Sequence, residues 1–161
     1  MTIAMILAIV AMACVIAGGI SDIMKFEIPD WLSIAIAVAA IGYAAVTPGF
    51  DWIQHLAGAV LVFSVGLFAF SRGWMGGGDI KLLTAISAWT GLHGLMLQLT
   101  ATAIAGGVLA IIVITARKGV AMAGVDQARA PRLFRKDAPL PYAVAIATGT
   151  FWWAWHAWPI T

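Results

Sequence analysis

The chain has 161 residues, of which 63% are apolar and only 10% are charged, and its mean hydropathy is +1.00. Soluble globular domains carry about 25% charged residues, so this composition excludes a water-soluble domain and predicts an integral membrane protein. The single cysteine, Cys14, excludes an internal disulfide and a four-cysteine zinc site. We interpret it as a small apolar helix residue.

Six apolar blocks follow one another along the chain, and each bilayer crossing takes about 20 apolar residues. The blocks lie at residues 2–20, 31–49, 52–70, 79–91, 94–116 and 139–158. Nothing remains for a second domain, so residues 1–161 are predicted to form one all-α membrane bundle of six transmembrane helices. The first block is interpreted as a retained span, because no basic residue precedes it and no clear small-residue cleavage site follows it.

The connector after the first span holds an aspartate that local helix geometry does not explain. Asp22 lies at the C-terminal end of the first helix, where the macrodipole is unfavourable to a negative charge. An ion pair with Lys25, one turn on, would compensate for it. Pro29 then breaks the backbone, and Asp30 is well placed to cap a second helix that begins at Trp31.

The third helix is predicted to begin near Trp52 and to end at Ser71, before a glycine run. Glycines at 76–78 would each cost a helix interior roughly 1 kcal/mol against alanine, so they predict a loop that delivers Asp79 to the first turn of the next helix. From Asp79 to Gly91 that helix is about 20 Å long, against a hydrocarbon core of about 30 Å. We favour a glycine segment that dips into the inner leaflet over a helix that continues past Gly91.

The stretch 117–138 is the one substantial hydrophilic loop, and the last helix is predicted to start at 139–142 with proline in its first turn. That helix ends in an aromatic belt at 151–158, which is typical of a membrane–water interface. The other tryptophans lie near predicted span ends, where we interpret them as anchors: Trp31, Trp52, Trp74 and Trp89.

The basic residues all fall after an odd-numbered span and before the next even one. They are Lys25, Arg72, Lys81, Arg117, Lys118, Arg129, Arg132, Arg135 and Lys136. Because basic loops stay in the cytoplasm, these three loops are predicted to face the cytoplasm, with both termini outside. The asymmetry accounts for the net charge of +2 and the pI near 9.0, so no nucleic-acid partner is implied. The basic cluster at 129–136 is expected to touch anionic lipid headgroups of the bilayer.

Asp22 and Asp79 are the two candidate functional residues. A carboxylate at membrane depth is costly and tends to be kept for ion passage or chemistry, whereas helix capping is the alternative explanation for Asp79. Both follow odd-numbered spans and are therefore expected on the cytoplasmic face at similar depth. Two carboxylates in one cleft would share a proton near neutral pH. The ionised member could then take a proton from water while the protonated member polarises a scissile carbonyl.

These stretches resemble the prepilin peptidase family, membrane aspartic proteases that cut leaders from type IV pilin precursors. The resemblance is closest to the short members that serve Flp/Tad pili (CpaA/TadV-like). It rests on Asp22, Lys25, Ile28 and Pro29 after the first span, on the Gly-x-Gly-Asp signature at Gly76, Gly78 and Asp79, on Ile80 to Leu83 that continue it, and on Leu140, Pro141 and Tyr142. The match covers essentially the whole chain, in order and at comparable spacing.

The resemblance implies a GxGD-type aspartic protease fold in the bacterial inner membrane, with Asp22 and Asp79 as the catalytic pair facing the cytoplasm. It implies a prepilin or pseudopilin substrate whose short basic leader is cut at the cytoplasmic edge of its apolar stalk. Glu27 and Asp30 are expected to help bind that leader.

Four further residues are expected to support the site on the same resemblance: Gly76, Gly78, Lys25 and Lys81. Lys81 either snorkels to the headgroups or tunes the pKa of Asp79. The carboxylate mechanism implies no metal and no cofactor, and the spacing of His55, His93 and His156 predicts interfacial side chains instead of ligands.

The chain departs from the family in two respects. Asp30 stands where many members have asparagine after the proline. The long bifunctional members carry a cytoplasmic insertion with paired zinc-binding cysteines and methylate the new pilin N-terminus, and this chain has neither the insertion nor those cysteines. Methylation by it is therefore not expected.

Two other functional classes stay open at this point. A small proton-coupled transporter or channel subunit would use Asp22 and Asp79 as relay carboxylates. Such a relay would place acids near mid-membrane, whereas the outer halves of the predicted spans hold little beyond Ser, Thr, Gln98 and His. A structural partner of a secretion machine would leave both aspartates dispensable. The pilin that is cut and the oligomeric state are left open.

Overall fold

The computed structural model describes residues 2–124, 131–135 and 138–157, and within these ranges all regular structure is helical. The elements are α1 (Ile3–Lys25), α2 (Asp30–Val46), α3 (Trp52–Ser71), α4 (Gly77–Met122), the short 3-10 helix η1 (Arg132–Phe134) and α5 (Tyr142–Ala157). This confirms the predicted all-helical class. Predicted features at Arg129, Lys136 and Trp158 lie outside the described residues.

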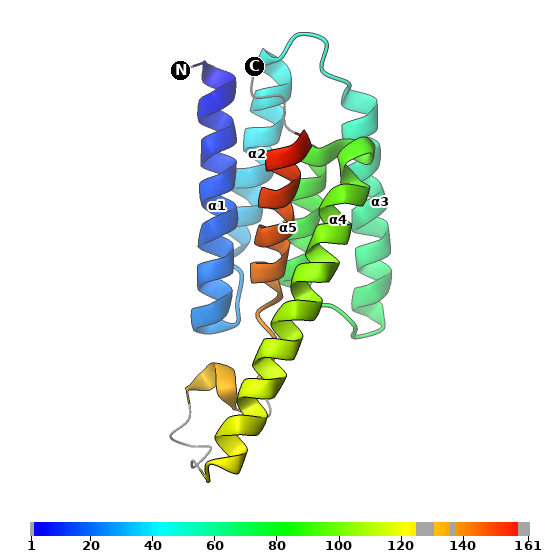
Figure 1. Cartoon of the computed structure of the whole chain (residues 1–161). Coiled ribbons are helices and arrows are strands. Elements are labelled where there is room, and N and C mark those ends of the chain that lie inside the picture. Colours follow the sequence, from blue (N-terminus) through cyan, green and yellow to red (C-terminus); the bar gives the residue numbers. More distant parts are fainter. Residues whose placement is uncertain (1, 125–130, 136–137, 158–161) are drawn as a thin grey trace.

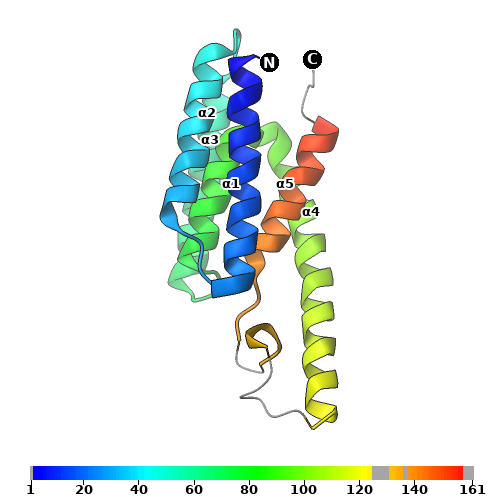
Figure 2. The ribbon, with the colours of Figure 1, turned by 90° about the vertical axis from the view of Figure 1, so that its left-hand side faces the viewer.

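The predicted count of six transmembrane helices is confirmed only in part. The described part of the chain forms five α-helices, and α1, α3 and α4 are long and apolar enough to cross a membrane. The predicted turn at 91–94 lies inside α4, at Gly91, whose φ of 59° and ψ of −179° are open essentially only to glycine. The helix folds back at this residue (Figures 1 and 2). We call residues 77–90 the first arm of α4 and residues 92–122 its second arm.

N-cap side chains cap the starts of α1 and α3, whereas no N-cap side chain makes a capping hydrogen bond at the start of α2 or α4. The Thr2 hydroxyl accepts a hydrogen bond from the Met5 N–H at the start of α1, and Asp51 accepts one from the Gln54 N–H at the start of α3. The predicted bounds of α3 are thereby confirmed. The predicted capping role of Asp30 is wrong, because α2 already begins at Asp30 and no side-chain hydrogen bond caps it. Its carboxylate has another partner, described below.

The first arm of α4 is the central helix of the bundle. Trp89 in this arm donates its indole N–H to the carbonyl oxygen of Ile36 on α2, at 3.0 Å. Buried residues of the arm make up much of the core, together with apolar side chains from α1, α2 and α5: Leu82, Leu83, Ala85, Ile86 and Trp89. Since this arm is surrounded by the other helices, its first turn is held at the middle of one end of the bundle.

The second arm packs against α5 through small residues. A Cβ added at Gly106 would lie 3.3 Å from the Tyr142 hydroxyl, and Gly94 and Gly149 leave room for Trp153 and Thr102 in the same way. Such close approach of helix backbones is typical of helix pairs in membranes. The second arm therefore runs antiparallel to α5 and fixes where α5 begins.

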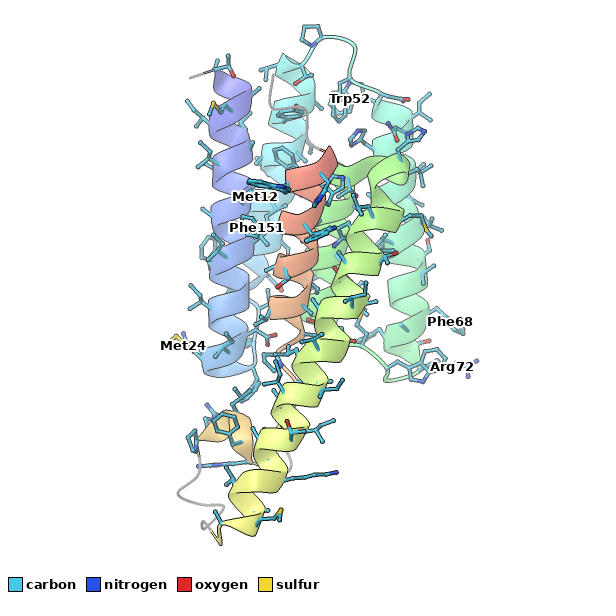
Figure 3. The ribbon with its side chains drawn as sticks, in the orientation of Figure 1. Met12, Met24, Trp52, Phe68, Arg72 and Phe151 are labelled. Carbon is cyan, nitrogen blue, oxygen red and sulfur yellow. The ribbon has the colours of Figure 1, made fainter. Side chains whose placement is uncertain are left out.

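All the candidate residues lie near one end of the bundle, where the helices that carry them begin or end. At this end α1 and α3 finish and α2, α4 and α5 begin, and the second arm continues beyond it (Figures 1 and 2). Figure 3 shows Met24 and Arg72 at this end and Trp52 at the opposite one. We call it the carboxylate end.

The predicted loop at 117–138 begins later than expected. Arg117 and Lys118 are still helical, because α4 extends to Met122. The Arg117 guanidinium donates from Nε to the carbonyl oxygen of Leu133 at 3.0 Å and from Nη2 to that of Pro139 at 3.2 Å. The basic side chain thus ties the second arm to the segment that leads into α5.

Candidate active site

Asp79 is held by its own helix start. It is the third residue of α4, whose N-cap is Gly76, and its half-buried carboxylate accepts a hydrogen bond from the Gly76 backbone N–H. An acidic side chain at this position commonly satisfies the free N–H of the N-cap residue. The predicted place of Asp79 in the first turn is confirmed. The predicted glycine loop is wrong in part, because Gly77 and Gly78 already belong to the helix.

Crowding explains why glycine stands at 76 and 78. A Cβ added at Gly76 would lie 3.0 Å from Oδ2 of Asp79, and one at Gly78 would lie 3.2 Å from the Cβ of Ile28. At Gly77 the nearest neighbour would be the Phe70 ring at 3.6 Å, which is ordinary contact. The Gly-x-Gly-Asp spacing therefore reflects two tight positions with a tolerant one between them.

Asp22 is held by a different helix from its own. It lies in the last turn of α1, is only 7% exposed, and accepts a hydrogen bond at Oδ2 from the Ala143 backbone N–H at 2.8 Å. Ala143 is in the first turn of α5, so the positive end of that helix offsets the unfavourable dipole of α1. No ion pair joins Asp22 to Lys25 in the described part of the chain, so the predicted compensation comes from α5 instead.

The structure brings Asp22 and Asp79 together at the carboxylate end. Their carboxyl groups are close enough to interact electrostatically. Side chains from α4 and from the connector also lie against α1, since a Cβ at Gly18 would make ordinary contact with Leu82 at 3.8 Å and with Ile28 at 4.0 Å. Ile28 thus packs against Gly18 on α1 and against Gly78 on α4. Through this side chain, the connector after α1 contacts both the helix that carries Asp22 and the helix that carries Asp79.

This arrangement favours a mixed protonation state. Each carboxylate accepts a backbone N–H at a helix N-terminus, which favours a negative charge. Two carboxylates in mutual electrostatic contact disfavour a second negative charge. The pair can therefore hold one proton between them, with an acceptor for a water proton on one side and a donor on the other.

Lys81 and Asp30 form an ion pair beside these carboxylates. Lys81 Nζ lies 2.8 Å from both carboxylate oxygens of Asp30, and both side chains are more than half exposed. The pair links the first residue of α2 to the first turns of α4. Neither role predicted for Lys81, snorkelling to the headgroups or tuning the pKa of Asp79, includes Asp30 as its partner. The Asp30 carboxylate is bound to Lys81 within the protein.

Of the remaining predicted residues, Lys25 is the last residue of α1 and Glu27 lies on the connector between α1 and α2. Lys25 and Glu27 are exposed, and the Glu27 carbonyl oxygen accepts a hydrogen bond from the Ser21 hydroxyl at 2.8 Å. This bond holds the connector against the end of α1. Sequence reasoning missed Ala143 altogether, because its contribution is a backbone N–H that no side-chain pattern reveals.

The histidines lie away from the carboxylate end. His55 Nδ1 is 2.9 Å from the carbonyl oxygen of Ala88, and His93 Nδ1 is 2.5 Å from Gln54 Oε1. These contacts brace the fold-back at Gly91 against the start of α3. Across the described ranges, no group of three or more His, Cys, Asp or Glu side chains is arranged to hold a metal ion.

Comparison with known proteins gives one match. A family model described as the type IV leader peptidase family matches residues 9–111. That stretch contains Asp22, Asp79, the connector between α1 and α2, and the fold-back at Gly91. No curated protein and no solved structure matches the chain.

Proposed function

The chain belongs to the type IV leader peptidase family, and from this premise we propose that it is a membrane-embedded aspartic endopeptidase that removes the leader peptide from prepilins or pseudopilins. The observation that carries the proposal is the meeting of Asp22 and Asp79 at one end of the bundle, each bonded to a backbone N–H. The motif resemblance supports Flp/Tad-type pilins as the substrate class.

The chemistry needs one ionised and one protonated carboxyl group. The ionised group takes a proton from a water molecule, whose oxygen attacks the scissile carbonyl carbon. The protonated group donates to the carbonyl oxygen as that oxygen gains charge. Collapse of the tetrahedral intermediate breaks the C–N bond. The proton taken from water passes to the leaving amine, and the second carboxyl group takes its proton back from the oxygen as the C=O bond re-forms. Both carboxyl groups then return to their starting states, so no other reactant is consumed.

We propose that the carboxylate end faces the cytoplasm and that both termini lie outside the inner membrane. The basic residues of the described chain support this orientation, because they gather at that end: Lys25, Arg72, Lys81, Arg117, Lys118, Arg132 and Arg135. Basic segments stay on the cytoplasmic side. In this orientation the two arms of α4 cross the bilayer separately, which gives six crossings in all.

A basic leader would approach an end of the bundle that carries acidic groups. Glu27 is exposed on the connector next to the site and is free of any partner in the described contacts of its carboxylate. Asp30 is already neutralised by Lys81 at 2.8 Å. We therefore propose that Glu27 contributes more than Asp30 to attracting the leader.

The test is co-expression with a tagged prepilin, followed by a mobility assay for the leader-sized shift. Asp22→Asn and Asp79→Asn keep a hydrogen-bond acceptor in place but remove the acid and base, so each should lower cleavage at least ~100-fold. Asp51→Asn is the matched control, since it makes the same chemical change at the opposite end of the bundle and asparagine also caps helices.

Undiminished cleavage in either Asn variant would overturn the proposal. Proton flux that depends on both aspartates, in a parent protein that cuts no prepilin, would favour the transporter instead. Equal activity of the parent and both variants in pilus assembly would favour a structural partner.

A further inference from the structure

A groove of about 750 Å³ runs along the bundle surface between α1 and α5. Gly19, Ile20 and Ile23 line it from α1, and Val144, Thr148 and Phe151 are among the residues that line it from α5. Exposed apolar side chains occur on every long helix of this protein, so apolarity alone does not distinguish the groove. The shape of the groove and the place where it ends distinguish it from these other apolar surfaces.

One end of the groove lies next to Asp22. Ile23 is the next residue after Asp22 on α1, and Val144 is the next residue after Ala143, whose N–H bonds the Asp22 carboxylate. Figure 2 shows α1 and α5 close together at this end and diverging toward the other. The narrow end of the groove therefore lies next to the Asp22–Ala143 hydrogen bond, which does not itself line the groove, and the groove widens away from that end.

The lining suits an apolar helix. The polar side chains in the groove are satisfied within α5, since the Thr148 hydroxyl donates to the Val144 carbonyl oxygen at 2.8 Å and His156 Nδ1 lies 2.9 Å from the Trp152 carbonyl oxygen. The small residues Gly19 and Ala147 form the close contact between α1 and α5, since a Cβ added at Gly19 would lie 3.8 Å from that of Ala147. The exposed apolar surface of the groove comes from Ile20, Ile23 and Phe151.

The length of the groove also fits a helix in the membrane. Its lining on α5 extends from Val144 to His156, and 12 residues of α-helix rise about 18 Å. This covers more than half of a hydrocarbon core of about 30 Å. An apolar segment seated there would begin beside Asp22 and continue toward the opposite face.

We propose that this groove receives the apolar stalk helix of the substrate, so that the peptide bond just before the stalk is presented to Asp22 and Asp79. The inference rests on the proposed peptidase function and adds the docking surface to it. The leader would then leave the groove at the carboxylate end, and the stalk would stay in the membrane between α1 and α5.

Site-specific photocrosslinking tests the docking surface. A benzophenone amino acid replaces Ile20 or Phe151 in an Asp79→Asn background, which is expected to bind substrate without cutting it, and is irradiated in membranes that contain the tagged prepilin. Both positions should crosslink to the stalk segment. Val65, 60% exposed on α3, is the matched control position and should give at least ~10-fold less adduct.

Adducts with lipid only, adducts with a second copy of the chain, or equal yields at Val65 would each overturn the docking proposal. Cleavage by the parent protein separates this failure from failure of the proposed function. If the parent cuts prepilin and the groove does not crosslink, only the docking surface is wrong.

A steric variant gives an independent readout. Thr148→Trp fills the groove from an exposed position, and it should raise KM for full-length prepilin at least ~5-fold while kcat stays within twofold. Val65→Trp should leave both parameters unchanged. An unchanged KM in Thr148→Trp, with a size-exclusion profile like that of the parent, would contradict the proposal.

Discussion

Asp79 and Asp22 are both aspartates that accept a backbone hydrogen bond, but the donors come from different parts of the chain. Asp79 takes its hydrogen bond from Gly76, three positions earlier in the same helix start. Asp22 takes its hydrogen bond from Ala143, which lies 121 positions away on α5. One environment is built by local sequence, and the other exists only once α5 has packed against the rest of the bundle.

This difference predicts which substitutions should disturb each carboxylate. The Asp79 region depends on the space left by glycines, so small increases in side-chain volume should disturb it. The Asp22 region depends on the placement of α5, so it should respond to changes in the first turn of that helix even where no side chain touches the acid.

The largest effect is expected from removing the donor of Asp22. Ala143→Pro eliminates the backbone N–H but keeps a residue type that a first helical turn tolerates. A hydrogen bond to a charged group is worth about 1.5–3 kcal/mol, and each 1.4 kcal/mol is about a factor of ten in rate. We expect cleavage to fall about 10–100-fold, measured with purified enzyme and prepilin in detergent.

Ala143→Gly is the control for that change, because it retains the N–H and adds no volume. Its cleavage rate should stay within about threefold of the parent. Equal losses in the proline and glycine variants would mean that the methyl group of Ala143, and not its N–H, matters to Asp22. Thermal unfolding of both variants separates a loss of fold from a loss of activity.

An intermediate effect is expected from adding a methyl group near Asp79. Gly76→Ala places a Cβ 3.0 Å from Asp79 Oδ2 and should lower cleavage about tenfold, because the carboxylate must move. Gly78→Ala meets Ile28 at 3.2 Å and should cost less, about threefold. Initial rates at saturating prepilin report both effects.

Gly77→Ala is the matched control between these two positions. Its Cβ would meet only ordinary contact with Phe70 at 3.6 Å, and alanine is favoured over glycine in a helix by about 0.5–1 kcal/mol. The variant should keep parent activity and unfold at a slightly higher temperature. Lost activity here would show that the whole glycine run, and not its two tight positions, is needed.

The smallest effect is expected at the exposed ion pair between Lys81 and Asp30. Exposed pairs contribute about 0–1 kcal/mol to stability, and Lys81 and Asp30 are 53% and 64% exposed. Lys81→Gln should therefore change the free energy of unfolding by no more than about 1 kcal/mol and cleavage by no more than threefold. A tenfold loss of cleavage, restored by exchanging the two charges, would assign the pair a positioning role.

Local features of the fold could be predicted from the sequence because their causes lie within a few residues. The start of α3 follows from the capping position of Asp51, and the place of Asp79 follows from the glycine run before it. The run itself is misread as a loop when glycine is judged by helix propensity alone. The first arm of α4 packs into the core of the bundle, and that packing outweighs the propensity cost of Gly77 and Gly78.

Long-range features could not be predicted, because they depend on which helices pack together. Nothing near Asp22 in sequence indicates that Ala143 is its donor. The pairing of Lys81 with Asp30 has the same origin, since 51 positions separate them. The fold-back at Gly91 is signalled by its turn-like neighbours, yet the helix continues on both sides of it.

Arg117 gives the bundle a mechanical consequence. Its guanidinium grips the carbonyl oxygens of Leu133 and Pro139 from a stretch of α4 that stands clear of the other helices. Pro139 is four residues ahead of Ala143, so the protruding end of α4 is linked, through the backbone of residues 139–143, to the N–H that bonds the Asp22 carboxylate.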